Sequence, residues 1–363
     1  MDGGDPSDAA FLTARVDRDL LLVAEGRDVT TTGSGRDRTE PPRESPAPSL
    51  REVLLSRARS VDLLALSTVP VALLATFALP EATRRSLAFA YHDPTLLTAF
   101  SAHYVHLEAA HLLANVAAYG LLAGVGYLLA VASGQRRLFF TAFATFCLAF
   151  PFALSALNLA VPRRAIGFGF SGVNMAFAGL LPLLLAAFVH AHLSDRGSAP
   201  VVPTPTPRSG GGERVPLSGS APVRLLPATF LVVVGWIGVL ALPASADLTG
   251  LVAPGVLLGG LLLGVRGVLS TPLERRPSIR GGLRRVIDRR GYGDLFAVGA
   301  TLTVAYPVVG FPTDPGVDGG VINLYVHFLG FCLAFIGPYV LLAGGVFDER
   351  SARLGASTDL RPD

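Results

Sequence analysis

The chain alternates long apolar runs with shorter polar or charged stretches. Runs of about 20 mostly apolar residues are long enough for a helix that crosses the core of a bilayer. Such runs lie near residues 61–79, 107–132, 138–161, 167–190, 225–243, 249–269, 294–312 and 321–345. The fourth run and the last two contain Gly or Pro, which transmembrane helices tolerate better than soluble helices do. The pattern predicts an all-α polytopic membrane protein with about eight transmembrane helices.

Polar and low-complexity stretches divide the chain around a predicted membrane domain, residues 51–346. Residues 1–50 lack the charged-then-apolar order of a signal peptide and are predicted to be a disordered cytoplasmic tail. Residues 193–222, rich in Pro, Gly and Ser, are predicted to form a flexible cytoplasmic linker. Residues 270–293 are predicted to be a basic cytoplasmic loop, and residues 347–363 a cytoplasmic C-terminal tail.

Composition and charge support the membrane interpretation and give it an orientation. Hydrophobic residues make up 51% of the chain and charged residues 16%. The chain has no lysine, and arginine gathers in the segments that would face the cytoplasm if the first helix starts there. Because positive charge is retained on the cytoplasmic side, the sequence predicts a multi-pass protein of the cell membrane with both termini cytoplasmic. The predicted external loops hold only Arg84, Arg85, Arg163 and Arg164.

The basic segment "RRPSIRGGLRRVIDRR" is interpreted as a loop that touches anionic lipid headgroups, and not as a nucleic-acid-binding site. Cys147 and Cys332 both fall within apolar runs, so we expect packing roles for them and no structural disulfide.

Several polar side chains fall within or beside the apolar runs, where burial in lipid is costly enough to make each a candidate functional residue. Three of the spans that carry them run from outside to inside, and each candidate lies near the external end of its span. His111 and Asn115 are four residues apart and therefore share one helical face. The full set is His103, His106, His111, Asn115, Ser171, Asn174 and His327.

Small residues on two of these spans predict a close helix–helix approach. Gly172, Ala176 and Gly179 share a face of the fourth span, and Gly330 and Ala334 share a face with His327 on the eighth. A serine hydroxyl becomes a nucleophile when a positioned base takes its proton, and neutral histidine suits that role near neutral pH. We therefore predict that Ser171 and His327 meet between these two spans.

The surroundings of Ser171 fit the needs of acyl transfer. The Ser171 backbone N–H, the Asn115 amide and a His111 N–H could stabilise the oxyanion that attack on a peptide carbonyl creates. The segment "GFGFSG" places glycines around the start of the helix, where they free the backbone. It is not the G-x-S-x-G elbow of hydrolases, because Val173 stands where the last glycine belongs.

Three short motifs, in this order, resemble those of the rhomboid intramembrane serine proteases. The segment "HYVHLEAAHLLAN" resembles the histidine-rich entry to the second core helix of that family. The segment "GFSG" resembles its G-x-S-G motif, and "HFLGFCLA" resembles H-x-x-G-x-x-x-G/A on its last core helix. The resemblance covers roughly residues 61–345.

The resemblance implies a catalytic dyad of Ser171 and His327 without a third carboxylate, and an oxyanion hole that includes His111 and Asn115. It implies hydrolysis of a peptide bond in or beside the transmembrane segment of another membrane protein. Transmembrane protein substrates and the lipid bilayer would be the partners, with no nucleic acid, no metal and no organic cofactor. The supporting positions would be His106, Gly169, Gly172, Met175 and Gly330.

The chain departs from the family pattern in three ways. Three spans are predicted between Ser171 and His327, where the family has one. Met175 occupies a position where many members have an aromatic that packs on the base, and the first external loop has no tryptophan–arginine pair. Two alternatives stay open: a catalytically inactive rhomboid-like protein that binds membrane clients, and a transporter with polar residues along its substrate path.

Overall fold

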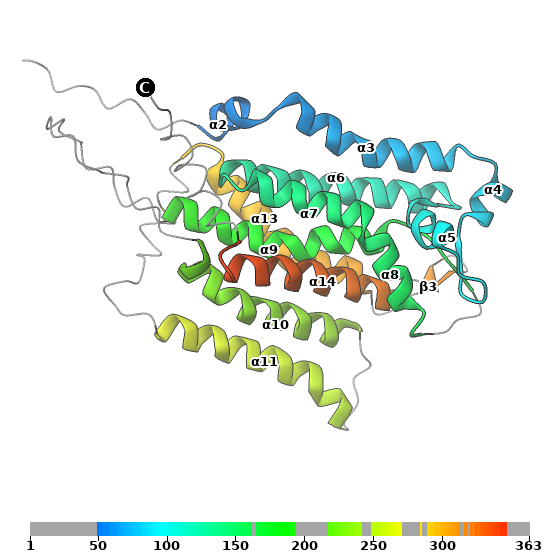
Figure 1. Cartoon of the computed structure of the whole chain (residues 1–363). Helices are drawn as coiled ribbons and strands as arrows, with labels where there is room; N and C mark the ends of the chain where they lie inside the picture. The colour runs from blue at the N-terminus through cyan, green and yellow to red at the C-terminus, as the bar shows by residue number, and fades with distance from the viewer. Residues whose placement is uncertain are drawn as a thin grey trace, which may run out of the picture. The chain divides into compact units, whose positions relative to one another are not determined.

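The computed structural model describes residues 49–161, 165–193, 217–241, 248–270, 284, 289–312, 316–317, 320–321 and 323–346. Almost all of the predicted N-terminal tail, the predicted C-terminal tail and most of the linker and the basic loop lie outside these ranges. The described part of the chain is mostly helical, with two short pairs of strands (Figure 1).

Seven helices in the described ranges are long and apolar enough to cross a membrane. They are α3 (Ser60–Phe77), α6 (Ala109–Ala132), α9 (Ser171–Leu193), α10 (Ala221–Ala241), α11 (Leu248–Leu269), α13 (Tyr292–Gly310) and α14 (Leu324–Ala343). An eighth crossing results if α7 (Arg136–Leu148) and α8 (Phe150–Asn158) are counted as one bent span. These helices confirm the all-α polytopic class predicted from the sequence.

The third predicted span, residues 138–161, is not one straight helix. Its two parts, α7 and α8, meet at a bend of 48°. Pro151 lies in the first turn of α8, where its missing N–H costs no intrahelical hydrogen bond but where α7 cannot simply continue. The bend directs α8 toward the segments that precede α6.

The shorter elements lie between the long helices. They are α2 (Leu50–Arg57), α4 (Glu81–Ser86), α5 (Leu96–Ser101), η1 (Ala102–Tyr104) and η2 (Leu217–Gly219). Strand β1 (Phe89–Ala90) pairs antiparallel with β2 (Ile166–Gly167), with Phe89 opposite Gly167. Strand β3 (Gly316–Val317) pairs antiparallel with β4 (Gly320–Val321). The β1–β2 pair joins the loop before α5 to the glycine-rich segment that enters α9.

Helix α9 forms the centre of the bundle. In its most apolar stretch, 83% is buried inside the protein. The corresponding share is 17% for α3 and 11% for α11. It packs against α6, α10, α13 and α14. In Figure 1, α3 and α11 lie at opposite edges, and α11 is reached from the centre through α10. Helix α9, which begins at Ser171, is therefore surrounded by other helices of the bundle.

Helices α6, α9 and α14 run in the same direction, and α13 runs against them. Near its end, α6 packs Gly126 against Leu181 and Leu184 in the second half of α9. At the other end of the bundle, Gly172 at the start of α9 packs against Val326 at the start of α14. The starts of α6, α9 and α14 and the end of α13 therefore share one end of the bundle.

A buried ion pair joins helices near the opposite end. Asp62 at the start of α3 is 1% exposed and accepts two hydrogen bonds from the Arg136 guanidinium. The Tyr127 hydroxyl also donates to Asp62, at 2.9 Å. This cluster ties α3 to the end of α6 and the start of α7, far along the bundle from the start of α9.

Candidate active site

Ser171 is the first residue of α9 and is half-buried. Two residues earlier, Gly169 has φ +108°, a conformation that L side chains rarely adopt. A Cβ added to Gly169 would also lie 2.8 Å from Cε1 of His111. The Gly169 N–H donates to the Ala102 carbonyl at 2.9 Å. The backbone conformation and the lack of space for a side chain both require glycine here. The segment that enters α9 therefore packs directly against the start of α6.

His327 lies in the first turn of α14 and is 7% exposed. Its Nδ1 atom is 2.7 Å from the carbonyl oxygen of Gly310, the last residue of α13. Because a carbonyl oxygen can only accept, Nδ1 must carry the proton in this contact. The neutral ring then has its acceptor lone pair on Nε2. The ring of Phe311 packs edge-to-face with that of His327, with centroids 6.1 Å apart.

The starts of α9 and α14 are in close contact through glycines. A Cβ added to Gly172 would lie 2.5 Å from Cγ1 of Val326, and one added to Gly330 would overlap the carbonyl oxygen of Gly172. These contacts involve Gly172 and Val326, the sequence neighbours of Ser171 and His327, and Gly330, which lies one turn after His327. The two helices thus approach as the small-residue faces predict.

Among the described residues, Ser171 and His327 do not form a hydrogen bond with each other: the hydrogen bond of the His327 ring goes to Gly310. Hydrogen bonds between catalytic groups are often long or poorly aligned without substrate and tighten when it binds. The structure therefore brings the two helix starts together, while the dyad itself stays a prediction.

The predicted oxyanion residues lie on the adjacent helix α6. Asn115 is 4% exposed, and its Nδ2 atom donates to the His111 carbonyl at 3.0 Å. Its Oδ1 atom accepts from Nδ2 of Asn174 on α9 at 3.1 Å. Asn174 therefore fixes the orientation of the Asn115 amide and links it to the helix that begins at Ser171. Asn174 thus bonds within the bundle.

The predicted supporting histidine, His106, is fully buried and packs its ring edge-to-face on that of His111, at 4.9 Å. Its Nε2 atom makes no hydrogen bond to the described residues. Burial, and secondarily the charge of His111, lower the pKa of His106 to about 4. His106 is therefore neutral at physiological pH, and its ring packs against that of His111.

His103 is also buried and lies in η1. Its Nε2 atom is 3.1 Å from the Ser155 hydroxyl of α8, which itself donates to the Ala99 carbonyl. Burial lowers the pKa of His103 to about 4. The contact links α8, beyond the bend, to the segment before α6.

Arg84 anchors the first loop, a role that the sequence did not reveal. One of its guanidinium nitrogens donates to the carbonyls of His106 and Leu107, at 2.7 and 3.1 Å. The guanidinium also lies 4.6 Å from the ring centroid of Phe77. A phenylalanine–arginine contact thus holds the loop that enters α6.

An amide network fixes the start of α14, and it too was missed. Asn323 caps α14 by accepting from the Val326 N–H at 3.3 Å. Its Nδ2 atom donates to Oδ1 of Asn158 at 3.1 Å and to the Tyr91 hydroxyl at 3.3 Å. Asn158 also donates to Tyr91. These hydrogen bonds join the start of α14, one turn before His327, to the first loop and to the end of α8.

In the part of the chain that the structure describes, three long helices lie between α9 and α14 along the sequence: α10, α11 and α13. Helix α13 packs against both α6 and α9 and supplies the carbonyl that His327 contacts. Helices α10 and α11 pack against each other. The Met175 sulfur lies against Gly310, and the aromatic ring beside His327 is that of Phe311.

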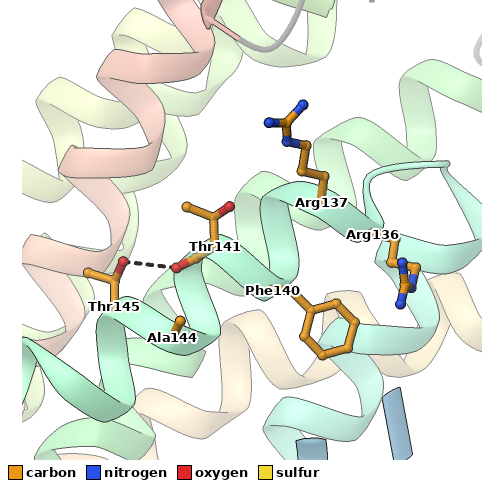
Figure 2. Close-up of a pocket in the computed structure, with 6 residues that line it drawn as sticks. All are labelled: Arg136, Arg137, Phe140, Thr141, Ala144 and Thr145. Carbon is orange, nitrogen blue, oxygen red and sulfur yellow. Dashed lines mark hydrogen bonds between the residues drawn. The ribbon is translucent and has the colours of Figure 1, made fainter. Parts of the chain in front are cut away.

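A surface hollow lies elsewhere, on α7 (Figure 2). All of its lining residues come from one helix, and Thr145 there donates to the Thr141 carbonyl of the same helix. It contains none of the predicted site residues, so we interpret it as a groove on the flank of α7. Its lining residues are Arg136, Arg137, Phe140, Thr141, Ala144 and Thr145.

In the described ranges, no group of three or more His, Cys, Asp or Glu side chains is arranged to hold a metal ion. Comparisons of the chain with protein families, with curated proteins and with solved structures find no match.

Proposed function

We propose that this membrane protein is a rhomboid-type intramembrane serine endopeptidase that cleaves transmembrane segments of other membrane proteins. Ser171 is the nucleophile and His327 the general base. One observation carries the proposal: the Nδ1–H of His327 is held by the Gly310 carbonyl, which leaves Nε2 as the acceptor on a helix in contact with the start of α9.

In this mechanism, Nε2 of His327 takes the Ser171 proton as Oγ attacks the peptide carbonyl. The resulting imidazolium then gives its proton to the leaving amine, and an acyl-enzyme ester remains on Ser171. Water then attacks the ester carbonyl while His327 takes its proton, and the imidazolium returns that proton to Ser171 Oγ as the ester bond breaks and the carboxylic acid product leaves. The buried position of His327 and its fixed Nδ1–H suit both proton transfers, because the ring keeps one orientation throughout.

Three groups near the start of α9 could donate to the oxyanion. Ser171 opens α9, and the first N–H groups of a helix have no intrahelical acceptor and sit at the positive end of its dipole. His111 touches Gly169, two residues before Ser171, and Asn115 lies one turn further along α6. Loss of one such donor typically costs roughly 3 to 4 kcal/mol of transition-state stabilisation.

A catalytically inactive rhomboid-like protein that binds membrane clients is the second candidate. The missing hydrogen bond between Ser171 and His327 in this structure favours it. In that case, the amides and histidines around α9 would serve structure alone, and neither Ser171 nor His327 would be needed for client binding.

Cleavage of a transmembrane reporter by the purified protein in liposomes separates the two candidates. Ser171→Ala and His327→Ala should each abolish cleavage. Two matched controls should keep it: Ser67→Ala removes a span hydroxyl that donates to its own helix, and His92→Ala removes an exposed loop imidazole. Cleavage by the Ser171→Ala variant at the wild-type rate would refute the proposal, and reporter binding without cleavage by the wild type would favour the client-binding protein.

A further inference from the structure

The contact between His327 and α13 uses a special backbone group. The last four carbonyls of an α-helix have no N–H partner within the helix. Gly310 ends α13, and its carbonyl oxygen instead accepts the Nδ1–H of His327, at 2.7 Å. The C-terminus of a helix also carries the negative end of the helix dipole, which favours a neighbouring cation.

We propose that the C-terminus of α13 is the third member of the catalytic unit, with Gly310 as the positioning residue for His327. The inference rests on the proposed function. A catalytic triad uses a carboxylate to hold the histidine tautomer and to stabilise the imidazolium that forms during attack. In this chain, the Gly310 carbonyl holds the tautomer, and the helix dipole behind it stabilises the imidazolium.

The surroundings keep that carbonyl in place. The N–H of Phe311 donates to the Pro307 carbonyl at 2.9 Å and so closes the last turn of α13. The Phe311 side chain is 2% exposed and packs edge-to-face on His327. On the other side, a Cβ added to Gly310 would lie 2.6 Å from the sulfur of Met175.

Met175 connects this support to the nucleophile. It lies four residues after Ser171 on α9 and therefore faces the same side of that helix. Movement of Gly310 would thus be transmitted both to the ring of His327 and to the helix that begins at Ser171. Glycine at position 310 lets the two segments approach closely enough for the contact.

Replacement of Phe311 by phenyllactate tests the role of the carbonyl. The resulting ester makes the Gly310 carbonyl a weaker acceptor and also removes the Phe311 N–H that donates to Pro307, while the Phe311 side chain stays the same. The control must therefore lose a helical N–H as well. We expect kcat to fall about tenfold, equal to about 1.4 kcal/mol, with little change in KM. The matched control is phenyllactate at Phe335, which alters a carbonyl within α14 instead. Equal kcat in the two ester variants and the wild type would overturn the inference.

A second pair of variants tests the packing behind the carbonyl. Gly310→Ala places a methyl group against Met175 and should lower kcat at least as much as the ester does. Adding Met175→Ala removes the overlapping sulfur and should restore much of the lost kcat. A Gly310→Ala variant as active as the wild type would contradict the close packing on which the positioning depends.

The tautomer can be measured without catalysis, by ¹⁵N NMR of histidine-labelled Ser171→Ala protein, with His327→Gln to assign the signal. We expect a protonated Nδ1 and an unprotonated Nε2. The reverse tautomer would overturn the inference. Active enzyme that is insensitive to the ester defeats the inference alone, whereas the expected tautomer in a protein that never cleaves defeats the proposed function and reduces the contact to a structural one.

Discussion

Adding one methyl group at Gly330 should separate the two helices that carry the proposed dyad. Its Cβ would overlap the Gly172 carbonyl oxygen and lie 3.2 Å from the carbonyl carbon. Carbon atoms in favourable contact are about 3.5 to 4.0 Å apart. Helices α9 and α14 must therefore move apart by roughly 0.5 Å to relieve the contact with the Gly172 carbonyl carbon, and by more to relieve that with its oxygen. Gly172 directly follows Ser171.

Overpacking of this kind costs about 1 to 3 kcal/mol of stability. A misplacement of about 1 Å between reacting groups can cost about 100-fold in rate. We therefore expect Gly330→Ala to cleave a transmembrane reporter about 10 to 100 times more slowly than the wild type, with a lower unfolding temperature in detergent.

Gly337→Ala is the matched control, because it makes the same change on the same helix where no atom lies within 4 Å of the added Cβ. That control should keep full activity and gain up to about 1 kcal/mol from helix propensity. Equal activity and stability in the two variants would show that α9 and α14 are not in contact at Gly172, and would remove the geometric basis of the dyad.

Two further predictions concern buried charges and buried histidines. Arg136→Leu should lower the free energy of unfolding by roughly 3 kcal/mol, because it leaves Asp62 buried without its charged partner. Denaturant titration measures this, with Arg137→Leu at the exposed neighbouring position as the control. Equal free energies of unfolding in the two variants would contradict the prediction. Burial holds the pKa of His103 and His106 at about 4, below the usual 6.5. Between about pH 4 and pH 6.5 the unfolded chain therefore binds more protons than the folded one. The free energy of unfolding should fall by up to about 3 kcal/mol per histidine as pH drops from about 6.5 to about 4. Unfolding temperatures that stay constant over this range would refute the expectation.

The long helices could be predicted from the sequence because lipid selects them by length and apolarity alone. Each predicted apolar run has a helical counterpart in the described residues. The bend between α7 and α8 could not be predicted, because Pro151 is tolerated in many straight transmembrane helices. The bent helix places Ser155 against His103, which is 52 residues away along the chain, and no local pattern marks that pairing.

The predicted site residues could be found because polar groups in apolar runs are conspicuous, and their helical spacing assigns them to faces. The structure brings the starts of their helices together. Gly310 and Phe311 escaped notice for the opposite reason. One contributes only a backbone carbonyl and the other an ordinary apolar ring, so neither differs in the sequence from a lipid-facing residue.

Arg84 and Asn323 were missed for another reason. Each lies in a loop or at a helix end, where polar residues are expected and carry no signal. Their roles depend on partners from distant segments: the His106 carbonyl for Arg84, and Asn158 with Tyr91 for Asn323. Pairing across such distances follows from the packing of the helices and not from local pattern.

Labelling with a fluorophosphonate serine probe tests activation of the Ser171 hydroxyl most directly, with the modified residue mapped by mass spectrometry. The account predicts that the wild type and His92→Ala are labelled at Ser171 and that His327→Ala is not. Labelling of Ser171 that persists undiminished in His327→Ala would show that this imidazole does not activate the hydroxyl, and no labelling of the wild type would contradict a serine protease.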